Sequence, residues 1–118
     1  MALHNELGEE GEKLAVEWLV KNGYEIIHRN WQHGRYEIDI IALKDDCLRI
    51  IEVKTRNDSP FGDPEDSVTH RKFRNLQRAA DQFLHLNPEH DWIQYDILSI
   101  TKYKNKDPEY FLLEDVFL

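Results

Sequence analysis

The sequence predicts one domain of the α/β (α+β) class, a mixed β-sheet flanked by helices in the order α-β-β-β-α-β-β. Its 118 residues are the usual length of a single domain, so residues 1–118 are expected to fold together. Two segments space their apolar residues as amphipathic helices do. The runs between and after them are rich in β-branched residues, which favour strands.

Each element has its own signal in the sequence. The first helix is expected to end just before Gly23, because glycine commonly follows the last turn of a helix, and the strand YEIIHRN begins directly after it. The next two strands are separated only by Asp45-Asp46-Cys47, which is typical of a hairpin. A loop at residues 56–66 contains two prolines and precedes the second helix. The predicted elements are a helix at residues 3–22, strands at 24–30, 36–44 and 48–55, a helix at 70–86, and strands at 92–100 and 110–113.

The composition excludes several classes of protein. No apolar run approaches the ~20 residues of a membrane helix, and the first residues lack the basic start and apolar core of a secretory signal. Cys47 is the single cysteine, so neither a disulfide framework nor a multi-cysteine metal site is expected. We therefore expect a cytoplasmic protein with no membrane partner. The net charge of −8 argues against binding nucleic acid through overall charge, but carboxylates also build the divalent-metal sites of enzymes.

The predicted hairpin contains the sharpest functional signal. If its turn has two or four residues, Asp39 lies across from Glu52, and the same register puts Glu37 across from Lys54. All four side chains then share one face of the sheet, whereas a three-residue turn would shift the register and separate them. Two neighbouring carboxylates repel each other unless a cation lies between them, and Mg²⁺ or Mn²⁺ prefers such oxygen ligands. Lys54 would then hold a phosphate oxygen or orient a water; the alternative is a surface hairpin with a Glu37–Lys54 ion pair.

The first helix carries one acidic residue at an unexpected position. Glu12 projects between Val16 and Leu19, within the apolar sector of the helix. A buried carboxylate needs a partner, so Glu12 is either a fourth acid of the metal site or an edge residue that reaches water or caps a neighbour.

The second helix carries a row of cations. Lys72 borders its apolar arc, whereas Arg71, Arg74 and Arg78 lie on the opposite side. These arginines form either a solvated face or a stripe that binds phosphates along a nucleic-acid strand.

A set of motifs extends over nearly the whole chain. Its members are Gly8-x-x-Gly11-Glu12-x-x-Ala15, Gly23-Tyr24, Arg29-Asn30-Trp31, Glu37-Ile38-Asp39-Ile40-Ile41-Ala42, Glu52-Val53-Lys54-Thr55-Arg56, the series Val68, Lys72 and Leu76, and Tyr95-Asp96. Together they resemble the YraN-like family of small uncharacterised bacterial proteins. That family is similar to Holliday-junction resolvases and other nucleases of the PD-(D/E)XK superfamily.

The resemblance implies a restriction-endonuclease-like core and assigns roles to matching residues. It implies Asp39, Glu52 and the Val53 carbonyl as metal ligands, Lys54 as the catalytic lysine, Glu12 as the first-helix carboxylate and Lys72 as the lysine of the second helix. Two positions depart from the pattern. Ile38 replaces the superfamily's proline, and Tyr36 replaces a frequent glycine, which narrows the approach to the site.

We therefore expect a Mg²⁺- or Mn²⁺-dependent endonuclease that acts on DNA, in particular branched or structured DNA. Glu37 would orient Lys54, and Glu12 would bind a second metal or an outer-shell water. The expected phosphate contacts are Lys72, Arg71, Arg74, Arg78 and Arg56. The alternatives are a nucleic-acid-binding module without turnover, and a protein-interaction subunit that forms a homodimer through its apolar residues 110–113 and 116–118.

Overall fold

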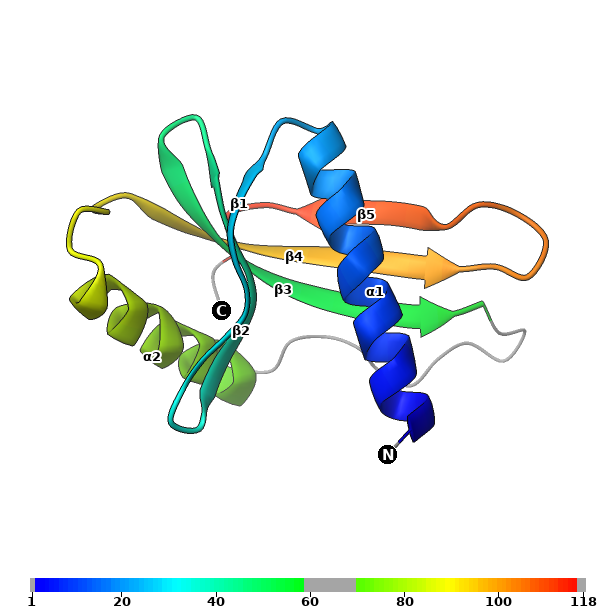
Figure 1. Ribbon diagram of the computed structural model, residues 1–118, viewed down its shortest axis with the longest axis horizontal. Coiled ribbons are helices and arrows are strands. Elements are labelled where there is room, and N and C mark those ends of the chain that lie inside the picture. The colour runs from blue at the N-terminus through cyan, green and yellow to red at the C-terminus, as the bar shows by residue number, and fades with distance from the viewer. Residues whose placement is uncertain (1, 59–69, 117–118) are drawn as a thin grey trace.

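The computed structural model describes residues 2–58 and 70–116, the first six of them by their backbone alone. Its elements are α1 (Ala2–Lys21), β1 (Glu25–His33), β2 (Tyr36–Lys44), β3 (Cys47–Asn57), α2 (His70–Leu86), β4 (Ile93–Lys102) and β5 (Glu109–Leu113) (Figure 1). The strands form one sheet in the order β1-β2-β3-β4-β5. β3 and β4 are parallel and the other neighbours are antiparallel. The predicted α+β class and element order are confirmed.

Some details differ from the sequence-based expectation. β1 extends to His33 and forms a hairpin with β2, which reverses at Gly34, where φ is 61°. Cys47 belongs to β3 rather than to the preceding turn, and it is fully buried. Residues 59–66 of the predicted loop, Val68 of the motif set and residues 117–118 of the apolar tail lie outside the described residues.

The β2–β3 hairpin has the register expected for a two-residue turn. Asp45 and Asp46 form that turn with φ values of 53° and 61°, which is the left-handed conformation that tight hairpin turns require. The paired residues run from Lys44 with Cys47 to Ile40 with Ile51. Aspartate tolerates this conformation better than most residues, so the Asp-Asp sequence fixes the register.

The ladder between β2 and β3 stops before the predicted acidic pairs. Its final pair is Ile40 with Ile51, so Asp39–Glu52 and Glu37–Lys54 are not ladder pairs, and that part of the prediction is wrong. β2 instead continues along β1, and Asn30, next to Arg29 in β1, is left-handed with a φ of 49°. Figure 1 shows the turn end of the β1–β2 hairpin directed away from β3.

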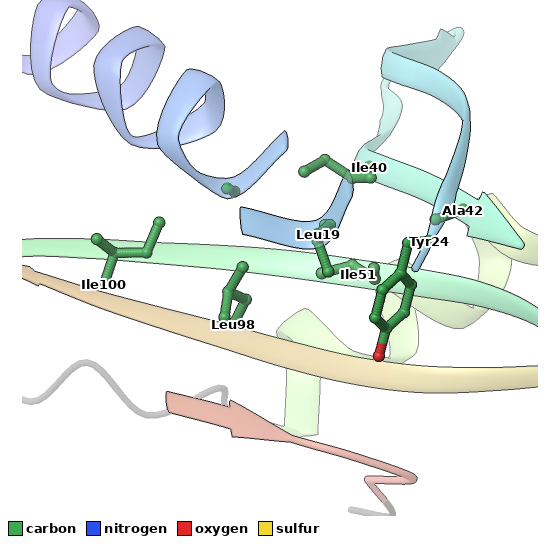
Figure 2. Close-up of a cluster of buried hydrophobic side chains, with 8 residues drawn as sticks. Leu19, Tyr24, Ile40, Ala42, Ile51, Leu98 and Ile100 are labelled. Atoms are coloured by element: carbon green, nitrogen blue, oxygen red, sulfur yellow. The ribbon is translucent and has the colours of Figure 1, made fainter. Parts of the chain in front are cut away.

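The two helices cover opposite faces of the sheet, each over its own core. On the α1 side, Leu19 packs with Ile40, Ile51 and Leu98, and Figure 2 shows Leu19 directed toward Ile51. On the α2 side, the buried residues are Ile38, Ile41, Leu48, Ile50, Leu76, Ala79, Ala80 and Phe83. Ile38 and Ile41 lie in the same cluster although strict alternation would separate them, because β2 twists between them. Among the described helices, none is long and apolar enough to cross a membrane.

Gly11 allows α1 to cross β3 at close range. A Cβ atom on Gly11 would overlap the side chain of Thr55 and lie 2.8 Å from its Cβ. Only a glycine therefore fits this crossing without a shift of the helix. The close approach brings Glu12, the next residue of α1, against the sheet.

Candidate active site

Asp39 bridges the point at which β2 and β3 separate. Its Oδ2 accepts a hydrogen bond of 2.9 Å from the backbone N–H of Val53. A side-chain carboxylate thus continues the connection between the strands just beyond their last backbone pair. Since Glu52 directly precedes Val53, this bond holds the two carboxyl groups in the same region.

Asp39 and Glu52 are crowded carboxyl groups. Burial and, next, the negative charge of Glu52 raise the pKa of Asp39 from 3.8 to about 7, although the hydrogen bond from Val53 opposes the rise. Burial also raises the pKa of Glu52, while the positive charges of Lys54 and Lys72 lower it. The pair therefore resists carrying two negative charges, which is the property of a site that accepts a cation.

Glu12 reaches the same region from α1. The residue is only 8% exposed, and its Oε1 lies 3.7 Å from the Nε of Arg29. Burial raises the pKa of Glu12, and the charge of Arg29 and contact with Asn30 limit the rise. Within the described part of the chain, Oε1 has no hydrogen-bond partner. Glu12 also contributes to the raised pKa of Asp39, so the two carboxyl groups interact.

Lys54 and Glu37 flank the carboxylate pair. The Nζ of Lys54 lies 4.0 Å from the Oε1 of Glu52, at the limit of an ion pair. Glu37 is exposed and accepts a hydrogen bond of 3.4 Å from Gln32. Its negative charge raises the pKa values of both Asp39 and Glu52. The fold is therefore compatible with the prediction that these residues come together. They lie where β2 and β3 separate, beyond the last backbone pair of the two strands.

The donor set is suited to a hard divalent cation. Within residues 2–58 and 70–116, no group of three or more His, Cys, Asp or Glu side chains is arranged around one ion position. The donors that the resemblance implies are the carboxylates of Asp39 and Glu52, whose charges interact, and the carbonyl group of Val53, which follows Glu52. Mg²⁺ commonly binds through one or two carboxylates and keeps several waters, so the residues fit Mg²⁺ or the similar Mn²⁺.

A cavity of about 920 Å³ opens next to this pair, between α2 and the turn that joins β1 to β2. Glu37 and Glu52 line it together with residues of α2. Its other lining residues are Arg35, Tyr36, Arg71, Lys72, Arg74, Asn75, Leu76 and Arg78. The cations predicted on the second helix thus face the carboxylates, and one of them, Lys72, acts on the pKa of Glu52.

The lining of the cavity differs from the contacts predicted from the sequence at three residues. Arg35 and Tyr36 line the cavity but were not predicted as site residues. Their position directly before Glu37, as a basic residue followed by an aromatic one, could have indicated that they belong to the site. Arg56, which was predicted as a phosphate contact, does not line this cavity. Its Nε donates a hydrogen bond of 3.4 Å to Thr101 Oγ1 on β4.

A second buried polar cluster lies elsewhere and was not predicted. Asp96 is fully buried, and its Oδ2 lies 3.6 Å from the Nη1 of Arg49, which donates a hydrogen bond of 3.0 Å to Glu114. The Oδ1 of Asp96 accepts hydrogen bonds of 3.0 Å from Gln94 Nε2 and from the Asp115 N–H. This cluster attaches the segment after β5 to the sheet.

The chain matches a known protein family over most of its length. Residues 11–100 match the family described as "Uncharacterised protein family UPF0102". A UPF0102 protein of Flavobacterium psychrophilum is 42% identical over 117 residues, which cover 99% of this chain and 98% of the relative. A UPF0102 protein of Bacteroides fragilis is 44% identical over 100 residues, covering 85% of this chain and 83% of the relative.

A UPF0102 protein of Syntrophomonas wolfei is 45% identical over 100 residues, covering 83% of this chain and 86% of the relative. The family match contains every residue of the candidate site, from Glu12 on α1 to the cations of α2. The chain therefore belongs to the uncharacterised protein family UPF0102, the YraN-like family.

Proposed function

We propose that this protein is a metal-dependent endonuclease that hydrolyses phosphodiester bonds of DNA, in particular of branched or structured DNA. The observation that carries the proposal is the Asp39–Glu52 pair, two partly buried carboxyl groups whose pKa values are both raised. Such a pair, with Lys54 beside Glu52 and with Glu52 lining a cationic cavity, has the features of a phosphate-processing site.

The resemblance to PD-(D/E)XK nucleases supports the same proposal. In that superfamily an aspartate and a Glu-x-Lys motif on neighbouring strands carry the chemistry, and Asp39, Glu52 and Lys54 occupy the matching positions here. The divergence of β2 from β3 after Ile40 opens the sheet at the place where these residues lie. A restriction-endonuclease-like core is therefore part of the proposal.

Each residue of the candidate site has a distinct role in this proposal. Asp39, Glu52 and the Val53 carbonyl would hold Mg²⁺ or Mn²⁺, which supplies a water of lowered pKa and stabilises negative charge on the phosphate. Lys54 positions a phosphate oxygen or the attacking water. Glu37 acts on the orientation of Lys54, and Glu12 binds an outer-shell water or a second ion.

The cations of α2 hold the phosphates on either side of the cleaved bond. Among them, Lys72 is the one whose charge lowers the pKa of Glu52. The others are Arg71, Arg74 and Arg78. Arg56 contacts a more distant part of the strand, beyond the cavity.

The proposal is tested by incubating the protein with duplex, single-stranded, flapped and four-way DNA in the presence of Mg²⁺ or Mn²⁺. Wild-type protein should cleave at least one form, and Asp39→Asn and Glu52→Gln should reduce the rate by about 100-fold or more. Asp91→Asn, which changes an exposed aspartate in the same way, is the matched control and should leave the rate unchanged. Equal cleavage by wild type and Asp39→Asn would show that a contaminating nuclease is the source.

A second candidate is a nucleic-acid-binding module on the same fold. The cationic lining of the cavity favours binding whether or not cleavage follows. This candidate predicts salt-sensitive DNA binding that survives Asp39→Asn and Glu52→Gln, with no turnover in any metal. Metal-dependent cleavage that is lost in those variants would exclude it.

A third candidate is a subunit that pairs through β5. This strand lies at the edge of the sheet, and its Phe111 and Leu113 side chains are 64% and 46% exposed. Exposed edge strands with apolar side chains are templates for pairing, here with a second copy of the chain. Sedimentation should show a wild-type dimer and a Phe111→Ser monomer, whereas a wild-type monomer at all concentrations would remove this candidate.

A further inference from the structure

The cavity beside Glu52 has two walls of different chemistry. One wall is the cationic side of α2, with Arg71, Arg74 and Arg78. The other is the β1–β2 turn, which contributes Arg35 and Tyr36. Half of the ten lining residues are cations, although the chain as a whole has a net charge of −8. Such a local excess of positive charge attracts phosphate groups to this cavity rather than to the rest of the surface.

The size of the cavity suits one nucleotide with its neighbouring phosphates. Its volume of about 920 Å³ lies near the upper end of the range for small-ligand pockets, roughly 300–1,000 Å³. Arg71 and Arg78 are separated by about 10 Å along the helix axis, so their guanidinium groups are far enough apart to contact different phosphates of one strand.

The turn wall contains two flat groups, the ring of Tyr36 and the guanidinium group of Arg35. Tyr36 is half-buried against the core on the α2 side, which fixes the position of its ring. The guanidinium carbon of Arg35 lies 5.7 Å from the centre of that ring. Aromatic rings and guanidinium planes are the groups on which unpaired bases stack. Bases within a duplex are already stacked on each other, so this wall selects an unpaired base.

We infer that the cavity binds an unpaired nucleotide of a nucleic-acid strand, with its phosphates against α2 and its base against Tyr36 and Arg35. A single strand is the polymer that presents a charged edge and a flat apolar edge at the same time, which is what the two walls require. The inference deepens the proposed function and rests on it in one respect, the placement of the bound nucleotide next to the cleaved bond. Binding itself needs neither the metal nor cleavage.

The inference is tested by fluorescence anisotropy in EDTA, with three labelled probes of equal length. The probes are oligo(dT), an abasic oligonucleotide with the same phosphates, and a DNA duplex. Wild-type protein should bind oligo(dT) about tenfold more tightly than the abasic strand, because one stacked base contributes on the order of 1–3 kcal/mol. It should bind the duplex no better than the abasic strand. Equal affinity for all three probes, or preference for the duplex, would overturn the inference.

Variants separate the two walls. Tyr36→Leu keeps apolar packing but removes the flat ring, and it should abolish the preference for oligo(dT) over the abasic strand while leaving abasic binding unchanged. Tyr36→Phe should restore the preference, and Tyr103→Leu, a tyrosine that does not line the cavity, should keep it. A preference that survives in Tyr36→Leu, with circular dichroism showing the variant folded, would contradict the role of Tyr36.

The cationic wall has its own matched pair of variants. Arg74→Ala should weaken binding of all probes and reduce the salt dependence of affinity by about one counterion, as for one phosphate contact. Lys104→Ala removes a positive charge from an exposed site outside the cavity and should change neither quantity. Equal effects of the two variants would reject the wall as the binding surface.

Binding and cleavage together distinguish this inference from the proposed function. Tyr36-dependent binding of oligo(dT) without cleavage in any metal would remove the nuclease proposal and leave the binding site. Metal-dependent cleavage by a protein that prefers duplex probes would retain the nuclease and remove the unpaired-nucleotide site.

Discussion

Two aspartates of the same sheet, the buried Asp96 and the partly buried Asp39, have opposite surroundings. Asp96 has two hydrogen-bond donors on Oδ1, and Arg49 lies 3.6 Å from its Oδ2. Asp39 accepts a hydrogen bond from the N–H of Val53, but the charge that acts on it most strongly is the carboxyl group of Glu52. Asp96 therefore lies beside the positive charge of Arg49, whereas Asp39 is acted on by the negative charge of Glu52.

The difference teaches how to separate a structural carboxylate from a functional one. A buried charge that is paired within the chain holds segments together, and here Asp96 and Arg49 attach residues 114–116 to β3 and β4. A buried pair of like charges weakens the folded state and is relieved by a cation from outside. Substitutions at the two clusters should therefore have different effects, of which the loss of stability at the Arg49–Asp96 cluster is expected to be the largest.

Arg49→Met should destabilise the protein by about 3–5 kcal/mol, because it leaves Asp96 buried without a compensating charge. Urea denaturation at neutral pH measures the change. Arg56→Met, which alters an exposed arginine near the end of the same strand, should change stability by less than about 0.5 kcal/mol. A small effect at both positions would contradict the structural role of the Arg49–Asp96 cluster.

Lys54→Met should lower the rate of DNA cleavage by about 100-fold, because an ammonium group beside the carboxylate pair is lost from the transition state. Stability should be nearly unchanged, which would separate this lysine from Arg49. Single-turnover kinetics with the preferred DNA form measure the rate, and Lys104→Met is the control. An unchanged rate in Lys54→Met would remove the lysine from the proposed mechanism.

The pH dependence of stability should reveal Asp39 in the absence of divalent ions. Its pKa is raised from 3.8 to about 7 in the folded protein, so the folded state binds a proton that the unfolded chain releases. The free energy of unfolding contributed by this group therefore falls as pH rises from about 4 to about 7, and stays low above that.

Asp39→Asn should remove that fall and make the protein more stable than wild type at about pH 8, by up to about 4 kcal/mol. The amide oxygen can still accept the Val53 hydrogen bond, so the variant isolates the charge. Thermal or urea denaturation in EDTA at several pH values measures it, with Asp91→Asn as the matched control. A variant less stable than wild type at every pH would show that the charge of Asp39 does not destabilise the folded protein.

Two glycines of α1 should respond in opposite directions to alanine. Gly11→Ala should lower stability by about 1–3 kcal/mol, because the added methyl group overlaps Thr55 and displaces the helix that carries Glu12. Gly8→Ala has open space around its Cβ and should raise stability by about 0.5–1 kcal/mol through helix propensity. Two stabilising substitutions would mean that α1 does not cross β3 as closely as described.

Much of the fold follows from local sequence signals. The apolar spacing defined both helices, and the Asp45-Asp46 pair fixed the register of the β2–β3 hairpin through its left-handed turn. The unusual position of Glu12 in an apolar sector also pointed to a buried acid, and the residue is only 8% exposed. These features depend on neighbours in the chain, so one sequence is enough to predict them.

Other features depend on contacts between distant segments. The β2–β3 ladder ends at Ile40, where the β1–β2 hairpin turns away from β3, and no local pattern around Asp39 indicates this end. The pairing of Arg49 with Asp96 requires β3 and β4 to be parallel neighbours, which is a property of the whole sheet. The cavity wall at Arg35 and Tyr36 likewise exists only because α2 packs opposite the turn.

The most direct measurement is the anomalous scattering of a crystal soaked in Mn²⁺ at neutral pH. The expected result is one strong peak between the carboxylates of Asp39 and Glu52, within about 2–3 Å of their oxygens and of the Val53 carbonyl, and its loss in Asp39→Asn. No peak there in the wild-type crystal, or a peak that persists in the variant, would contradict the claim that these two carboxyl groups are held together for a cation.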